Sequence, residues 1–166
     1  MRLIPEPRRC KQALVVAVCI LAGCGGSRES KFVAVGGNGF RFEAPAGWKV
    51  QAIPRGRGAS HDSEMVQVAA FPLVKAYDPA LFGKVASELA LRMQEIAQRT
   101  GGSVTKVETV APAGIKSHSY SVNVGKHVDQ YTFVLRGKRE YQLLCRRRSS
   151  SSDAFCKRLI SSFRPA

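Results

Sequence analysis

The sequence is short of acidic residues, of histidine and of closely spaced metal ligands, and each shortage excludes a class of protein. Its 166 residues include 12 Asp plus Glu and three histidines, His61, His118 and His127. No H-x-x-x-H or Cys-x-x-Cys spacing occurs, so a zinc site would lack ligands. We therefore expect no bound metal and no cofactor.

Long apolar runs are missing too. The run Ala13–Leu21, at ~1.5 Å per residue, is too short to cross the ~30 Å hydrocarbon core of a bilayer. It follows a leader that carries Arg2, Arg8, Arg9 and Lys11. A basic leader, a short apolar run and small residues at its end are typical of a secretory signal.

The end of this run, Leu21-Ala22-Gly23-Cys24, resembles a bacterial lipobox. In that family, lipid is attached to the cysteine thiol and the signal is removed just before the cysteine. The resemblance implies a signal peptide over residues 1–23, lipidation of Cys24 and a lipidated tether over 24–31. It also implies a place in the cell envelope, anchored to the membrane and facing the periplasm or the cell exterior. The remaining length predicts one domain, over residues 32–166. Ordinary signal cleavage without lipid is the alternative.

Two cysteines remain after that cleavage, because Cys10 and Cys19 leave with the signal and Cys24 carries the lipid. Cys145 and Cys156 then face an oxidising compartment, where disulfides persist. A redox pair would more typically have Cys-x-x-Cys spacing. We therefore predict a structural disulfide between Cys145 and Cys156.

Positive charge dominates the mature chain. Of the 26 Lys plus Arg residues four lie in the leader, as does one of the 12 acids, which leaves 22 cations, 11 acids and a net charge near +11. Outside the cytoplasm we expect an anionic polymer or an envelope protein as the partner, and no nucleic acid. A solvated basic face is the alternative. The candidate contacts are Arg55, Arg57, Arg136, Lys138, Arg139, Arg146, Arg147 and Arg148.

Catalytic patterns are also missing. Ser60, His61 and Asp62 are of the types that hydrolases use, but adjacent positions do not supply the triad's geometry, and no G-x-S-x-G surrounds the serine. The surrounding segment Pro54–Glu64 has turn residues and little apolar content, which predicts a mobile surface loop. We therefore expect no catalytic residues and a protein that is not an enzyme; an envelope or cell-wall hydrolase is the alternative.

The remaining pattern predicts a mixed α+β domain. Apolar residues at three- and four-residue steps predict a long helix within Tyr77–Gly102, with Asp78 as its cap, Pro79 at its first position and Gly101-Gly102 at its end. A membrane-surface or partner-binding helix is the alternative interpretation of that stripe. A second amphipathic helix is predicted over Ser151–Phe163, with Cys156 on its apolar side. The predicted strands are Lys31–Val35, Phe40–Pro45, Trp48–Ile53, Met65–Leu73, Val104–Ala111, Ile115–Val124, His127–Leu135 and Arg139–Cys145.

The last three strands should form an antiparallel meander. Gly125-Lys126 and Gly137-Lys138 separate them, and two-residue turns that begin with Gly suit type II′ hairpins. The resulting register places Tyr120, Val122, Tyr131, Phe133, Leu135 and Leu144 on one face, and Val128, Val134, Tyr141, Leu143 and Cys145 on the other. Since neither face is polar throughout, we expect helices to cover both.

The stretch FRFEAPAGW (Phe40–Trp48) resembles the aromatic-x-aromatic-x-x-Pro-x-Gly-Trp entry of PsbP-like proteins. The later order is similar too: a strand, a long helix, antiparallel strands and a final helix that ends in Ser162-Phe163. That family shares its fold with a Ran-binding nuclear import factor and with many bacterial lipoproteins. The resemblance covers Phe32–Arg164 and implies an antiparallel sheet with helices on both faces, an α/β/α sandwich. Members bind proteins or other ligands, which implies a non-catalytic binding or accessory module.

Overall fold

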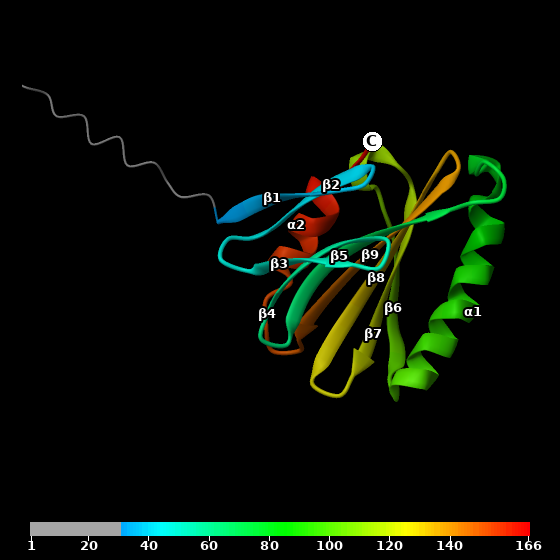
Figure 1. The fold of residues 1–166 in the computed structure, drawn as a ribbon. Coiled ribbons are helices and arrows are strands. Elements are labelled where there is room, and N and C mark those ends of the chain that lie inside the picture. The colour runs from blue at the N-terminus through cyan, green and yellow to red at the C-terminus, as the bar shows by residue number, and fades with distance from the viewer. Residues whose placement is uncertain (1–30) are drawn as a thin grey trace, which may run out of the picture.

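The structure, a computed structural model of the chain, describes residues 31–166. The predicted signal peptide, the lipidation site Cys24 and all of the tether except Lys31 therefore lie outside the described residues. Within residues 31–166, no helix is long and apolar enough to cross a membrane. This part of the chain folds into antiparallel sheets and two α-helices (Figure 1), which confirms the α+β class.

The strands form two sheets, whereas the sequence pattern suggested one. Gly47 adopts a φ of 81° between β2 and β3, and this left-handed turn directs the chain out of the first sheet. The small sheet has the order β1-β2-β10, with β1 (Phe32–Gly37), β2 (Phe40–Pro45) and β10 (Arg164–Pro165). The large sheet has the order β3-β4-β5-β9-β8-β7-β6, with β3 (Lys49–Ile53), β4 (Gly56–His61), β5 (Glu64–Pro72), β6 (Ser103–Val110), β7 (Ser117–Val124), β8 (His127–Arg136) and β9 (Arg139–Arg148).

The long helix α1 (Phe82–Thr100) begins slightly later than predicted. Asp78 caps a short 3₁₀ turn, η1 (Pro79–Leu81), in which its Oδ1 accepts a backbone hydrogen bond of 2.9 Å, and α1 follows directly. The helix ends, as predicted, at Gly101, which adopts a φ of 67°. The second helix, α2 (Ala154–Ser162), lies within its predicted range. A further 3₁₀ turn, η2 (Pro112–Gly114), joins β6 to β7.

The prediction of a surface loop over Pro54–Glu64 is wrong. Most of this segment is strand β4, which pairs with β3 on one side and β5 on the other. The pattern did not indicate a strand because its buried residues are Gly58 and Ala59, which carry little apolar surface. Gly56 also lets β4 lie close to β5, since a Cβ at this position would come within 1.9 Å of the Val68 carbonyl oxygen.

The predicted meander of β7, β8 and β9 is confirmed. Val124 pairs with His127 at one hairpin end and Arg136 pairs with Arg139 at the other, so each turn has two residues. Both turns begin with a glycine at positive φ, 58° for Gly125 and 54° for Gly137.

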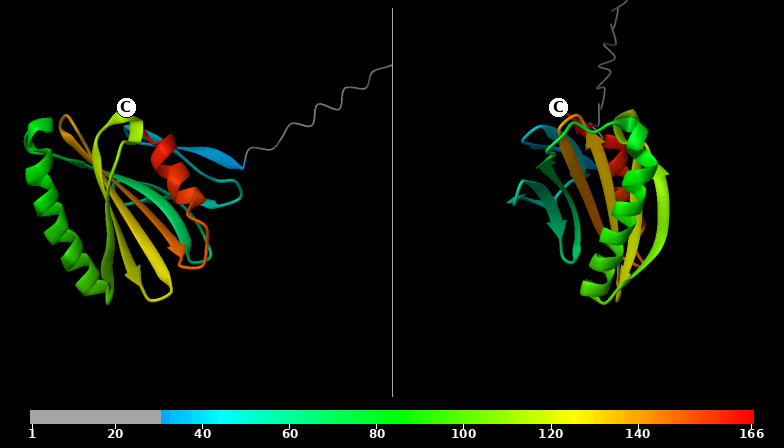
Figure 2. Two further views of the ribbon diagram at one scale, coloured as in Figure 1. Left: turned by 180° about the vertical axis from the view of Figure 1, so that it is seen from behind. Right: turned by 90° about the vertical axis from the view of Figure 1, so that its right-hand side faces the viewer.

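Each face of the large sheet carries its own core cluster. Phe133 and Val134 are neighbours on β8 and therefore point to opposite faces. The first cluster contains Leu89, Met93 and Ala97 of α1 with Tyr120, Val122 and Phe133. The second contains Cys156 and Leu159 of α2 with Val134, Tyr141, Leu143 and, from the small sheet, Phe42. Figure 2 shows α1 alongside β6 and β7.

Cys145 and Cys156 form the predicted disulfide, with their Cα atoms 5.4 Å apart. Both residues are buried in the cluster that α2 shares with the sheet. The bond therefore links β9 covalently to α2 through the core.

Candidate anion-binding groove

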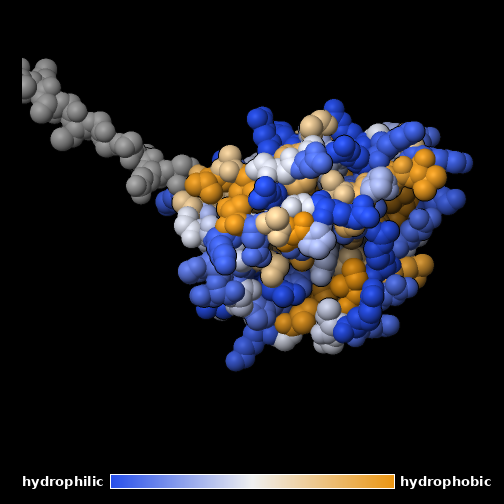
Figure 3. Space-filling view, in the orientation of Figure 1, coloured by the Kyte–Doolittle hydropathy of each residue, from blue (hydrophilic) through white to orange (hydrophobic). Residues whose placement is uncertain are grey.

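A groove of about 700 Å³ lies where the ends of four strands converge. Part of its lining comes from Gly36–Asn38 at the end of β1 and just after it, from Gly56 of β4 and from Ala70–Pro72 of β5. Figure 3 has the orientation of Figure 1, and the face of the molecule that it shows is largely hydrophilic with apolar residues interspersed. Four of the eight predicted contacts line this groove, named here the basic groove: Arg55, Arg57, Lys138 and Arg139.

Two of these cations come from the start of β4. Arg55 occupies the turn before β4 with a φ of 62°, and its carbonyl oxygen accepts a hydrogen bond of 3.0 Å from the Ala70 N–H. Its guanidinium Cζ lies 5.6 Å from the centre of the Phe71 ring, at a cation–π distance. Arg57 follows on β4 with an exposed side chain. The turn and the ring thus hold Arg55 over the groove wall.

The other two come from the hairpin between β8 and β9. The Lys138 carbonyl oxygen accepts a hydrogen bond of 2.9 Å from the Leu73 N–H, which ties this hairpin to the chain that leaves β5. Arg139 Nη1 donates to the Asn38 carbonyl oxygen at 3.4 Å, a long bond that links β9 to the turn of the small sheet. A Cβ at Gly39 would lie 2.0 Å from that nitrogen, so this turn leaves room for the guanidinium.

The positive charge of the basic groove is not balanced by acids. Within residues 31–166, no Asp or Glu oxygen lies within 4.0 Å of a charged nitrogen of these four residues. The acid nearest in sequence, Glu140, points to the α1 side, where Arg92 donates to it at 2.9 Å and Gln142 at 2.6 Å. Uncompensated guanidinium groups suit carboxylate or phosphate ligands, which they bind through two parallel hydrogen bonds.

The Arg146–Arg148 run lies elsewhere, and each member already has an intramolecular partner. Arg146 forms two hydrogen bonds with the buried Asp129, at 2.7 and 2.6 Å. Arg147 donates to three backbone carbonyls, that of Arg148 at the end of β9 and those of Ser149 and Ser151 in the loop after it, at 3.1 to 3.3 Å. Arg148 Nε lies 3.8 Å from the Glu64 carboxylate. The structure thus separates this run from the basic groove, and its role as a partner contact stays a prediction.

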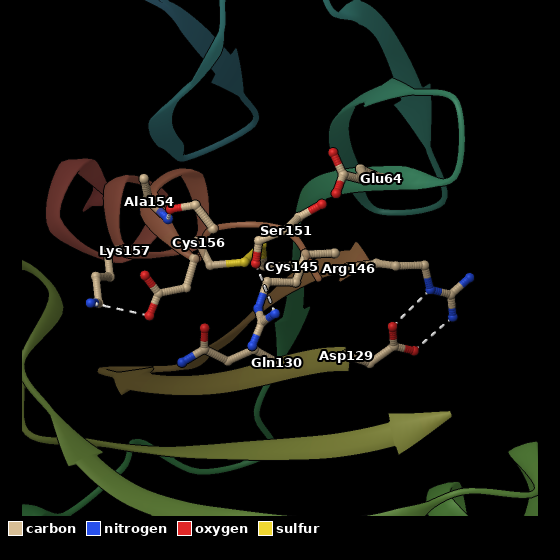
Figure 4. Close-up of a disulfide and its surroundings, with 12 residues drawn as sticks. Glu64, Asp129, Gln130, Cys145, Arg146, Ser151, Ala154, Cys156 and Lys157 are labelled. Carbon is tan, nitrogen blue, oxygen red and sulfur yellow. Dashed lines mark hydrogen bonds and ion pairs between the residues drawn. A yellow bond between two sulfur atoms is a disulfide. The ribbon is translucent and has the colours of Figure 1, made fainter. Parts of the chain in front are cut away.

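The loop that the disulfide closes is held by charge as well as by the covalent bond (Figure 4). Burial acts to raise the pKa of Glu64, but hydrogen bonds from the Ser151 side chain and the Arg148 N–H, together with the Arg148 charge, lower it below its ordinary value. The hydrogen bond to Asp129 is the largest cause that raises the pKa of Arg146. Both carboxylates therefore serve the fold around the disulfide.

The residue types noted for hydrolysis do not assemble into a catalytic site among the described residues. His61, the last residue of β4, and Asp62, in the turn that follows, lie 3.7 Å apart with side chains 65% and 70% exposed, so both are open to solvent. His118 is buried, stacks on Phe82 with ring centres 3.9 Å apart and shares a hydrogen bond with its carbonyl. Within residues 31–166, no group of three or more His, Cys, Asp or Glu is placed to hold a metal ion.

The sequence pattern missed part of the groove lining. Gly36–Asn38 falls between two predicted strands and Phe71 lies inside another, and none of these residues was a predicted contact. The available signal was that glycines, which leave the backbone exposed, occur next to separate groups of basic residues in the sequence. Only the fold shows that these separate segments meet at one groove.

No protein-family model matches the sequence, and no curated protein matches it either. Among solved structures, the chain is similar to cyanobacterial PsbP (CyanoP) from Synechocystis sp. PCC 6803, with a TM-score of 0.60, 16% identity, and coverage of 88% of this chain and 99% of that one. It is also similar to a protein from Bacteroides thetaiotaomicron VPI-5482, with a TM-score of 0.45, 12% identity, and coverage of 77% of this chain and 45% of that one. The first likeness shows a PsbP-like fold and, at this identity, the fold alone.

Proposed function

We propose that this chain is a lipid-anchored, non-catalytic binding module of the bacterial cell envelope. It is held on the membrane through lipid on Cys24, faces the periplasm or the cell exterior, and engages an anionic partner through the basic groove. The observation that carries the binding role is the set of four cations around one groove without a carboxylate within 4.0 Å among the described residues. Repulsion between clustered like charges destabilises the folded state, and a bound anionic ligand would relieve that repulsion.

The PsbP-like fold supports an accessory role. In our proposal the domain is an α/β/α sandwich, with α1 on one face of the large sheet and α2 on the other, in keeping with the two core clusters. Such a domain offers its strand ends and hairpins, rather than its buried faces, to a partner. The basic groove lies at those ends.

Cell fractionation with mass spectrometry tests the anchor. The wild-type chain should be recovered in the membrane fraction, with acyl groups on an amino terminus that begins at Cys24. A Cys24→Ser variant should lose the lipid and leave that fraction, because one or more buried acyl chains supply the anchoring free energy. An unmodified wild-type amino terminus would contradict the anchor while leaving the groove untested by that measurement.

Crosslinking in intact cells tests the groove. An Arg55→Ser, Arg57→Ser double variant removes two groove charges, and a Lys84→Ser, Arg99→Ser variant removes two exposed charges from α1 as its matched control. We expect the control chain to capture the same partner as the wild type, and the groove variant to capture less of it. The difference should narrow as salt is raised, because salt screens the charges that the variant lacks. Equal capture by both variants would exclude the basic groove as the contact.

A further inference from the structure

The basic groove is one part of a longer hollowed surface. A second hollow, of about 500 Å³, shares Lys138 and Arg139 with the basic groove and adds Arg136. A third, of about 440 Å³, shares Ala166 with the second and adds Arg41 and Arg164. Figure 1 places the carboxyl end of the chain beside the hairpin of β1 and β2, and the Ala166 N–H donates to the Gly39 carbonyl at 3.0 Å. The three hollows therefore form one continuous surface, named here the basic track.

Two pairs of arginines along the track oppose each other directly across strands. Arg136 faces Arg139 at the end of the β8–β9 hairpin, and Arg41 faces Arg164 between β2 and β10. Like charges in directly opposite cross-strand positions destabilise a sheet. Within residues 31–166, no carboxylate side chain lies within 4.0 Å of any of these four side chains. Arg139 and Arg164 also donate to backbone carbonyls, Arg139 to Asn38 and Arg164 to Ser161 and Phe163. These neutral carbonyls leave the positive charge of both pairs in place, whereas an external chain of anions would neutralise it.

We propose that the basic track binds an extended acidic segment of a partner protein. The inference rests on the proposed function and specifies the partner. A single phosphate or carboxylate would neutralise one or two neighbouring cations and leave the others uncompensated, whereas a chain with repeated carboxylates reaches all three hollows. Arginine supplies most of the charge, and its planar fork matches the geometry of a carboxylate.

The rest of the surface favours a protein over another linear polyanion. Val74, two residues after Pro72 of the groove lining, has 97% of its surface exposed, and Phe71 forms part of the groove wall. On one peptide, acidic side chains can pair with the cations and aliphatic side chains can pack against the apolar groups beside them. Polyphosphate carries no apolar groups for the second role. Single-stranded nucleic acid would need exposed aromatic rings on which its bases could stack. The track offers none of this kind at Phe40 and Tyr141, which are buried, or at Phe71, which Arg55 covers.

Fluorescence anisotropy with the full chain in detergent tests the proposal. The probe is a labelled peptide of about twelve residues, rich in Glu with interspersed Val, which spans roughly 40 Å when extended. A peptide of about four residues tests length, a Gln-for-Glu version tests charge, and unlabelled polyphosphate of similar charge is the competitor. We expect the long acidic peptide to bind more than tenfold tighter than the short one, and the Gln version not to bind.

Three variants separate the steps of the proposal. Arg55→Ser with Arg57→Ser should weaken both acidic peptides, by about two- to fivefold for each cation removed. Arg41 lines only the end of the track and forms no ion pair within residues 31–166, so Arg41→Ser should weaken only the long peptide. Lys84→Ser with Arg99→Ser should change neither. Unfolding curves confirm that each variant is folded, and Arg41→Glu provides a second variant at the same position.

The outcomes distinguish this inference from the proposed function. If the groove variant weakens binding but peptide length and Arg41 have no effect, the track is overturned and the basic groove stands. If polyphosphate displaces the peptide at a lower concentration than the unlabelled peptide does, the protein segment is overturned as the partner. If no variant differs from the α1 control, both the track and the proposed groove fail.

Discussion

Asp129 and Arg146 face each other on β8 and β9 and form an ion pair through two hydrogen bonds, at 2.7 and 2.6 Å (Figure 4). The carboxylate is fully buried, whereas the arginine side chain remains 34% exposed. A buried carboxylate needs its partner, because the charge would otherwise stand without water or a cation. Arg146 therefore belongs to the fold before it is available to any ligand.

Replacing Arg146 should destabilise the protein far more than replacing its neighbour Arg148. Arg146→Ser leaves Asp129 charged and buried without a partner, and we expect a loss of about 3 kcal/mol, at the low end for buried pairs because the arginine is partly exposed. Arg148→Ser should cost less than about 1 kcal/mol, since its side chain is 56% exposed and lies 3.8 Å from Glu64. Urea unfolding of the two variants measures the difference.

A double variant provides the control for this pair. Asp129→Leu with Arg146→Met removes both charges, so it should cost less than Arg146→Ser alone, because no orphan charge remains in the core. Equal stability of Arg146→Ser and Arg148→Ser chains would show that the Asp129 carboxylate finds water in the folded protein. In that case the fold would not require Arg146, and its side chain would be free to contact a partner.

The disulfide should stabilise the domain by closing a short loop. Cys145 and Cys156 are 11 residues apart, and the chain-entropy model gives about 3 kcal/mol for a loop of this size. We expect a Cys145→Ala, Cys156→Ala variant to unfold at correspondingly lower urea. Reductant should bring the wild-type curve to that of the variant and leave the variant unchanged. A wild-type curve that does not respond to reductant would contradict this account.

Local features of the sequence were enough to predict α1 and the hairpin turns, whereas the pairing of the cysteines was predicted from their count after signal removal and from the compartment. The apolar stripe of α1 depends on 3.6-residue periodicity, and Gly125 and Gly137 mark turns because they adopt positive φ at little cost. Once these turns set the register of β7 to β9, the alternation of side chains divides residues such as Phe133 and Val134 between two faces.

Features that depend on contacts between distant segments could not be predicted in this way. β4 was missed because small residues can pair as well as large ones when a neighbouring strand approaches closely, and Gly58 and Ala59 leave no apolar signature. The groove requires β1, β4, β5 and β9 to end together, which no local pattern encodes. The Arg146–Arg148 run looked like a free basic patch because its partners Asp129 and Glu64 lie on other strands.

Glu64 should make stability depend on pH on the acidic side. Because hydrogen bonds hold its pKa in the folded state below the ordinary 4.5, its contribution is fully present above that value and is lost as pH falls through the folded pKa. We expect Glu64→Gln to cost about 1 kcal/mol at neutral pH, and the cost to shrink as the medium is acidified below the ordinary value. Urea midpoints across that range measure it. If the stability difference between wild type and Glu64→Gln stayed constant with pH, residue 64 would stabilise the loop through hydrogen bonds that do not need its negative charge.

Two glycines should respond in opposite directions to the same substitution. A Cβ on Gly56 would lie 1.9 Å from the Val68 carbonyl oxygen and 2.9 Å from the Ala69 Cα, so β4 and β5 would have to separate. We expect Gly56→Ala to cost about 1–3 kcal/mol, as overpacking does. Gly83 of α1 has open space around its Cβ position, so Gly83→Ala should leave stability unchanged or raise it by up to about 1 kcal/mol through helix propensity. Thermal unfolding of both variants tests the pair. A Gly56→Ala chain as stable as the Gly83→Ala chain would mean that β4 does not approach β5 closely, and the placement of Arg55 and Arg57 beside the groove would then lose its support.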